Sequence, residues 1–136
     1  MRIVLDTNVL MSGIFFGGAA GDILRAWKAG RISLAASPEI IEEYVATGEV
    51  LSARYENIPL EPVLTLIVKH AELWQSPPLT EQVCSDLDDD KFLACALASG
   101  AECVVSGDKA LQRVSGYRNI PVVTPRRFVD TALKTG

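Results

Sequence analysis

Short apolar runs alternate with amphipathic helical stretches along this sequence, and that alternation limits its possible folds most strongly. The runs predicted as strands are short and mostly apolar: Arg2–Leu5, Ile32–Ala35, a brief run near Trp74, Glu102–Val105 and Ile120–Val123. Helical stretches between strands favour parallel pairing, because the chain has to cross over before it begins the next strand. We therefore expect an α/β sandwich with a mainly parallel sheet.

Local signals set the predicted helix boundaries. Gly30 closes a helix over Ala19–Ala29, and the pair Ser37-Pro38 begins a helix that runs to about Ala46. The remaining helices are expected over Leu60–Leu73, from the acidic run through Ala98, just after Asp108, and from Pro125 to about Lys134. No repeat or linker interrupts this pattern.

Length and cysteine content bound the class of protein. The 136 residues suit one domain over positions 1–136 and are too few for two ordinary ones. An acidic residue stands at position six and no apolar run reaches about 18 residues, so we expect a cytoplasmic protein without a membrane span. Three cysteines without CxxC spacing argue against disulfides and zinc. Cys95 and Cys103 are expected to be small buried hydrophobes, and Cys84 has no assigned role.

The charge of the chain is unevenly distributed. The net charge is −4, but positions 109–136 carry +5 and the first 108 residues carry −9. Such asymmetry points weakly to a side that faces a polyanion, although solvated helix faces would explain it equally. The candidate phosphate contacts are Lys109, Arg113, Arg126 and Arg127.

Acidic residues fall where predicted strands end and predicted helices begin. Asp6 follows the first strand, and Asp108 follows the strand that ends near Val105. Glu42 and Glu43 occupy the first turns of the helix after the second strand, and an acidic run at positions 86–90 precedes a later helix. In parallel sheets these positions meet at the carboxyl edge, where ligands bind. Each acid alone could be a turn or capping residue, but their conjunction favours a common site.

Crowded carboxylates need positive charge nearby, since they otherwise repel and their pKa values rise. The one histidine, His70, lies within a predicted helix far from the acids and is expected to be structural. A site with oxygen ligands alone suits Mg²⁺ or Mn²⁺, as one ion or two, rather than Zn²⁺.

Four segments resemble a known family, the PIN domains. The opening IVLDTNVLMSG is followed by SPEIIEEY, by DLDDDKFLACALASGAECVVSGDKAL and by IPVVTPRRFV, in that order and over nearly the whole chain. The sequence looks most similar to the toxin components of toxin–antitoxin pairs, the relatives of VapC. The resemblance implies a three-layer α/β/α fold, a Mg²⁺- or Mn²⁺-dependent endoribonuclease that leaves a 5′-phosphate and a 3′-hydroxyl, often a homodimer, and an antitoxin partner.

The resemblance also implies the site residues. The family's first, third and fourth acids match Asp6, Asp90 and Asp108. Helical periodicity does not choose between Glu42 and Glu43 for the second acid, whereas the family pattern favours Glu43, which stands directly before a large apolar residue.

Other residues have supporting roles in this interpretation. Thr7, Asn8 and Ser106 are expected to hydrogen-bond a carboxylate, a water or a phosphate, and Asp89 is either an assisting acid or only a charge at a helix start. The apolar stretch from Leu10 to Phe16 is either a core helix or a docking surface for a second subunit or an antitoxin segment.

Other functions fit the sequence less well. A haloacid-dehalogenase-type phosphatase with Asp6 as nucleophile needs a second aspartate two residues later, where this chain has Asn8. A receiver-type phosphoacceptor needs paired acids after the first strand, and Thr7-Asn8 does not supply them. The alternative that stays open is a PIN-like module that binds RNA or a protein and is catalytically weak.

Overall fold

The sheet contains five parallel strands. The computed structural model describes residues 1–58 and 60–134, and in that part of the chain the strands lie in the order β3-β2-β1-β4-β5. Their bounds are β1 Arg2–Leu5, β2 Ser33–Ala36, β3 Glu72–Leu73, β4 Cys103–Val105 and β5 Val122–Val123. Every pair of neighbours is parallel. The predicted parallel sheet is therefore confirmed, and the first strand of the chain is its centre.

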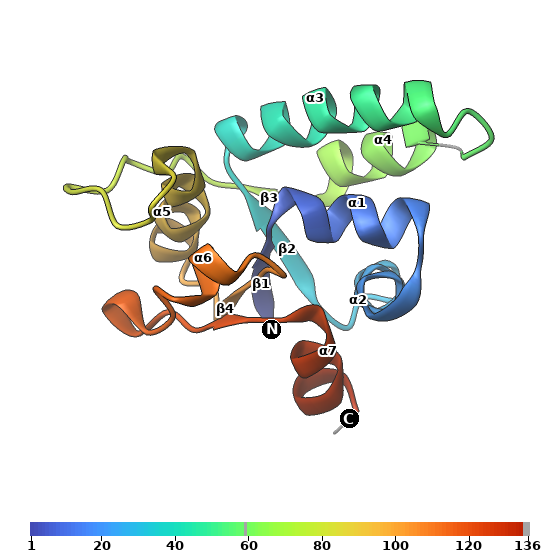
Figure 1. Cartoon of the computed structure of the whole chain (residues 1–136). Helices are drawn as coiled ribbons and strands as arrows, with labels where there is room; N and C mark the ends of the chain where they lie inside the picture. Colours follow the sequence, from blue (N-terminus) through green and yellow to red (C-terminus); the bar gives the residue numbers. More distant parts are fainter. Residues whose placement is uncertain (59, 135–136) are drawn as a thin grey trace.

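Helices cover both faces of the sheet, as a three-layer α/β/α sandwich requires (Figure 1). Within the described residues the α-helices are α1 Thr7–Phe15, α2 Gly18–Lys28, α3 Pro38–Arg54, α4 Leu60–His70, α5 Asp90–Ser99, α6 Lys109–Gln112 and α7 Pro125–Phe128. Helix α5 packs against β1, β2 and β4 on one face, and the α1–α2 pair lies on the other. Helices α3 and α4 pack against each other at one end of the molecule.

Helix α5 is buried because apolar side chains surround most of its circumference. Phe92, Leu93 and Cys95 are fully buried on it, and Gly100 ends it in the left-handed conformation, with φ of 69°. A helix that is apolar nearly all round needs covering on several sides. The sheet, α3 and the segment before α5 provide that covering.

The apolar stretch from Leu10 to Phe16 forms most of α1 and belongs mainly to the core. Leu10, Met11 and Phe15 are buried, which favours the core-helix alternative, and Phe16 alone is largely exposed. The ring of Phe16 meets the edge of Tyr55, at the end of α3, with centroids 5.5 Å apart.

Two other sequence predictions can be compared directly. Cys84, Cys95 and Cys103 are all free and buried, in agreement with the hydrophobe interpretation of the last two. His70 ends α4 and is exposed.

No single helix among the described residues is long and apolar enough to span a membrane. The bent α1–α2 pair meets the length and composition criteria only when both helices are taken together.

Candidate active site

The predicted acids meet where β1 and β4 end. After β1 the chain continues to β2 and β3 on one side, whereas β4 and β5 lie on the other, so the carboxyl ends of β1 and β4 form the switch point at which parallel sheets bind ligands. Asp6 directly follows β1 and its N–H donates to the carbonyl of Val105, the last residue of β4. The sheet itself therefore positions the first acid.

A serine hydroxyl connects the two strand ends. The buried Ser106 Oγ donates to Asp6 Oδ2 at 2.6 Å and accepts from the Asp108 backbone N–H at 3.0 Å. Asp108 then caps α6, accepting from the Ala110 N–H at 2.9 Å. These bonds fix Asp6 and Asp108 relative to each other, the supporting place expected for Ser106.

Glu43, and not Glu42, faces the other acids. The hydroxyl of the next residue, the buried Tyr44, donates to the Leu5 carbonyl at 2.6 Å and so ties α3 to the end of β1. Glu43 Oε2 accepts a hydrogen bond from Thr7 Oγ1, and Oε1 accepts from Lys91 Nζ at 2.6 Å. Glu42 is exposed and lines a hollow beside the segment before α5, which Asp88, Asp90 and Lys91 also line.

The charges of Asp6, Glu43 and Asp108 act on the carboxyl group of Asp89. Burial and the nearby charges of Asp6, Asp86, Asp108 and Glu43 raise the pKa of Asp89 to about 6. Its carboxylate accepts no hydrogen bond among the described residues, so nothing offsets that repulsion.

Asp90 has a different environment. Its two carboxylate oxygens accept hydrogen bonds from the Val83 and Cys84 N–H groups, at 3.0 and 2.7 Å. Burial opposes ionisation, but the hydrogen bonds from Cys84 and Val83 outweigh it and lower the pKa of Asp90. Asp90 thus fastens the segment before α5 to the first turn of that helix. The charges of Asp6, Glu43 and Asp108 act on Asp89, whereas Asp90, the third acid predicted from the sequence, binds the segment before α5.

Asp6 is the most enclosed of the acids. Burial raises its pKa, hydrogen bonds from Ser106 and the Asn8 N–H lower it, and the charges of Glu43 and Asp108 raise it, with a net increase. Asp6, Asp89 and Asp108 have no ion pair within the described part of the chain. The cluster therefore has excess negative charge.

This donor set suits a hard divalent cation. Burial, together with the charges of nearby acids, raises the pKa values of Asp6 and Asp89, and a cation bound beside them would favour their ionised forms. In residues 1–58 and 60–134, no three His, Cys, Asp or Glu side chains converge closely enough to ligate one ion directly. Mg²⁺ commonly retains several waters and uses only one or two carboxylates, so the acid cluster fits such an ion through water as well as direct contact.

A family model identifies the chain. The model described as "PIN domain" matches residues 2–110, which include β1, β4 and the four acids of the cluster. The chain belongs to the PIN domain family. PIN domains are generally nucleases, and the predicted resemblance is confirmed.

Comparison with solved structures supports the PIN fold. One similar structure is described as the crystal structure of VapBC2 from Rickettsia felis bound to a DNA fragment from their promoter. It shares 15% identity, with a TM-score of 0.64, and the match covers 91% of this chain and 98% of the other. At that identity the likeness concerns the fold alone. No curated protein matches the sequence.

A small hollow borders the acids of this PIN domain. It measures about 420 Å³ and is lined by Asn8, Val9, Ser12, Gly107, Asp108 and Pro125. Asn8 is exposed here, and its role as a ligand-binding residue stays a prediction. The hollow is large enough for part of a nucleotide beside Asp108.

The predicted basic residues are exposed near the carboxyl end of the chain. Arg126 and Arg127 line a hollow of about 790 Å³ beside the edge strand β5, together with Gln112. Arg126 lies 3.9 Å from Asp130, whereas Lys109, Arg113 and Arg127 form no ion pair within the described residues. Pro125 lines the small hollow beside Asp108, and the next residue, Arg126, lines the larger one. The two hollows are therefore adjacent along the chain.

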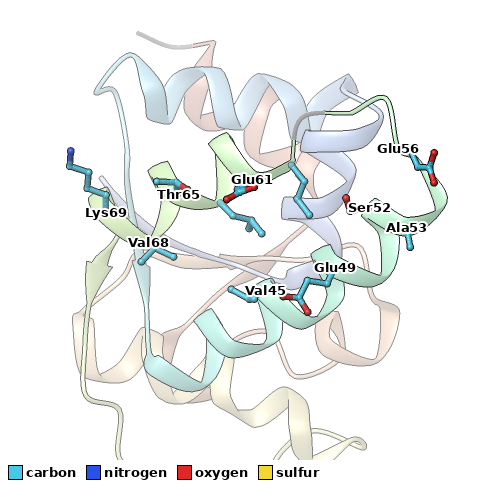
Figure 2. A pocket seen from close by; sticks show the side chains of 11 residues that line it. Val45, Glu49, Ser52, Ala53, Glu56, Glu61, Thr65, Val68 and Lys69 are labelled. Atoms are coloured by element: carbon cyan, nitrogen blue, oxygen red, sulfur yellow. The ribbon is translucent and has the colours of Figure 1, made fainter.

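A second surface lies away from the acids, between α3 and α4 (Figure 2). This α3–α4 groove measures about 840 Å³, and its apolar lining includes Val45, Leu60, Leu64 and Val68. Charged side chains also line it, and three of the four are acidic: Glu49, Glu56, Glu61 and Lys69. Such a groove suits an apolar segment that carries basic residues.

Sequence reasoning did not single out Lys91. This lysine contacts both Glu43 and Asp88, at 2.6 and 3.1 Å, and its side chain is only 16% exposed. Burial opposes its protonation, but hydrogen bonds to Glu43 and Asp88 outweigh it and raise the pKa of Lys91. The available signal was a lone basic residue directly after an acidic run.

Proposed function

We propose that this PIN domain is a Mg²⁺- or Mn²⁺-dependent endoribonuclease whose acids are Asp6, Glu43, Asp89 and Asp108. The observation that carries the proposal is the meeting of acids from separate segments at the sheet's switch point: Ser106 joins Asp6 to Asp108, and Thr7, next to Asp6, binds Glu43. Burial and the charges of Asp6, Asp86, Asp108 and Glu43 raise the pKa of Asp89 to about 6, which adds it to this cluster. Clusters of this kind with shifted pKa values are typical of functional sites.

Each acid has a distinct task in the proposed mechanism. A divalent ion bound here would supply polarisation of the phosphate and a lowered pKa for the attacking water. Asp6, Asp89 and Asp108 would hold that ion, and Ser106 keeps Asp6 and Asp108 in register. Glu43, fixed between Thr7 and Lys91, orients the water for attack on the phosphorus. The expected products carry a 5′-phosphate and a 3′-hydroxyl.

In this proposal, side chains that contact the RNA backbone position the RNA strand. Asn8 lies beside Asp108 and is placed to bind a phosphate or ribose next to the scissile bond. Arg126 and Arg127 extend positive charge along the adjoining hollow, and Lys109 and Arg113 add to it from the segment after Asp108. Such contacts position a strand without reading its sequence.

Cleavage of a mixed set of structured and single-stranded RNAs in Mn²⁺ or Mg²⁺ tests the proposal. Asp6→Asn and Asp89→Asn are expected to reduce the rate by at least about a hundredfold, as is EDTA, since each change removes metal binding. Asp90→Asn is the matched control one residue away. It removes the charge of the carboxylate that binds the segment before α5. Its main effect is expected on the melting temperature, with a smaller effect on the cleavage rate.

The opposite ranking would contradict the assignment of Asp89. If Asp90→Asn loses activity and Asp89→Asn retains it, the third acid of the site is Asp90 and not Asp89. Cleavage that survives Asp6→Asn and EDTA would remove the metal site, and absence of any cleavage would support the binding-module alternative. In that alternative, millimolar Mn²⁺ should not raise the melting temperature.

The toxin role is part of the same proposal, with an antitoxin as partner. The VapBC2 structure shares this fold, and the acidic rim of the α3–α4 groove supplies charge complementarity for a basic, apolar antitoxin segment. Val68 is 57% exposed in that groove, so a substitution there changes the surface and not the core.

Gene neighbourhood and co-purification test the partner. A short gene beside this one is expected to encode a protein that co-purifies with the chain and suppresses cleavage. Val68→Glu should abolish co-purification and leave cleavage by the free chain unchanged. Equal recovery of the small protein with Val68→Glu would exclude the groove as its binding site. A homodimer remains a separate prediction, to be measured by sedimentation.

A further inference from the structure

Lys91 occupies one side of the acid cluster. It is the second residue of α5, and its ammonium lies 2.6 Å from Glu43 Oε1 and 3.1 Å from Asp88 Oδ1. Its side chain is largely shielded from water, unlike that of Asp88, which is 68% exposed. An ion pair with such restricted access to solvent is screened much less than one on the surface.

The protein engages both carboxylate oxygens of Glu43. Thr7 Oγ1 donates to Oε2, and Lys91 Nζ donates to Oε1, so both oxygens already have a partner. Asp6, Asp89 and Asp108 have no cationic partner among the described residues. The ammonium of Lys91 therefore pairs with Glu43, whereas the other three acids need a cation from solution.

A second metal ion would have to bind beside Glu43, where the Lys91 ammonium already lies. In two-metal nucleases the ions lie about 3.5–4 Å apart and share the surrounding carboxylates. An ion beside Glu43 would have to displace an ammonium that contacts the carboxylate directly, or lie close to it and be repelled.

We propose that Lys91 is the resident counter-cation of Glu43 and that the site consequently binds one divalent ion per chain. This inference rests on the proposed metal-dependent function. Lys91 is a positioning residue that holds the Glu43 carboxylate in place, and Asp6, Asp89 and Asp108 would hold the single ion. Removal of the ammonium exposes Glu43 Oε1 and makes room for a second ion.

Isothermal titration with Mn²⁺ in the absence of RNA tests the proposal, with electron paramagnetic resonance as a second readout. The wild-type chain is expected to bind one ion and give the spectrum of an isolated Mn²⁺. Lys91→Met is expected to bind two ions and give the spectrum of a coupled pair. Lys91→Arg, which keeps the charge, should bind one.

Controls separate this role from a purely structural one. Lys28→Met removes an exposed charge from α2 and should bind one ion, as the wild type does. Two ions in the wild type, or one ion in a folded Lys91→Met, would overturn the inference and leave the nuclease proposal intact. A wild type that binds no Mn²⁺ would overturn both. If Lys91→Met does not fold, the wild-type count and the Lys91→Arg spectrum still decide.

Discussion

Asp89 makes the metal-free protein sensitive to mildly acidic pH. Burial and neighbouring carboxylates raise its pKa in the folded state to about 6, whereas an unfolded chain would have the ordinary value near 3.8. Between those values the folded state binds more protons than the unfolded state, so stability falls as pH rises. The free energy of unfolding should therefore be greater at pH 5 than at pH 7, by on the order of 1 kcal/mol after solvent screening.

Thermal unfolding in EDTA at the two pH values measures this effect. The melting temperature should be about 3 °C higher at pH 5 than at pH 7, and Asp89→Asn should remove most of that difference. Saturating Mn²⁺ should also remove it, because the ion stabilises the ionised carboxylate. A pH difference that is unchanged in Asp89→Asn would assign the effect to another group.

Ser106 stabilises the cluster through two hydrogen bonds to neighbouring strand ends. Ser106→Ala removes the donor to Asp6 and the acceptor for the Asp108 N–H, both near a buried carboxylate. We expect a loss of about 1–3 kcal/mol in the free energy of unfolding, measured by urea denaturation at pH 7. Ser85→Ala, at an exposed serine of the segment before α5, is the control and should change stability by less than about 0.5 kcal/mol.

The first turn of α5 separates Asp89 from Asp90 in a way that sequence alone does not reveal. Adjacent helical residues point about 100° apart, so one faces the cluster and the other faces the segment before the helix. Asp90 is fixed by the Val83 and Cys84 N–H groups, and that segment has no periodicity from which its path could be predicted. Asp6 and Asp108 were predictable because Asp6 directly follows β1 and Asp108 comes three positions after the end of β4, and both strands have a recognisable composition.

Helix α3 illustrates the same limit for the fold. Its start at Ser37-Pro38 was predicted correctly from local capping, and the Ser37 hydroxyl accepts from the Ile40 N–H at 3.3 Å. Its end was predicted near Ala46, but the helix continues to Arg54. A Cβ on Gly48 would lie 3.1 Å from Leu60 of α4, so packing between the helices supports the second half. That tertiary contact has no local sequence signal.

Tyr44 couples the placement of α3 to the acid cluster. Tyr44→Phe removes the hydrogen bond to the Leu5 carbonyl while keeping the buried ring. We expect a loss of about 1–2 kcal/mol in stability, because the carbonyl loses its donor, and a cleavage rate reduced several-fold as Glu43 shifts. Tyr55→Phe, at the far end of the helix, is the control. Equal cleavage rates in both variants would show that Tyr44 acts on stability alone.

Across the whole molecule, an acidic cluster adjoins an exposed basic carboxyl-terminal region. Arg126→Ala with Arg127→Ala should weaken RNA binding and make the slope of log affinity against log salt shallower by about 1–2, as expected when phosphate contacts are lost. Fluorescence anisotropy with labelled RNA in EDTA measures both. Arg25→Ala with Lys28→Ala, both exposed on α2, is the charge-matched control. An unchanged slope would exclude the hollow beside β5 from the RNA path.

The central place of β1 has a consequence for synthesis of the protein. The strand made first pairs with β2 on one side and with β4 on the other, and Asp108 comes only after β4. A nascent chain that ends before Asp108 carries Asp6, Glu43 and Asp89 but not the fourth acid. In the proposed ribonuclease we therefore expect no cleavage until Asp108 has been added, so the unfinished enzyme spares the message from which it is being read.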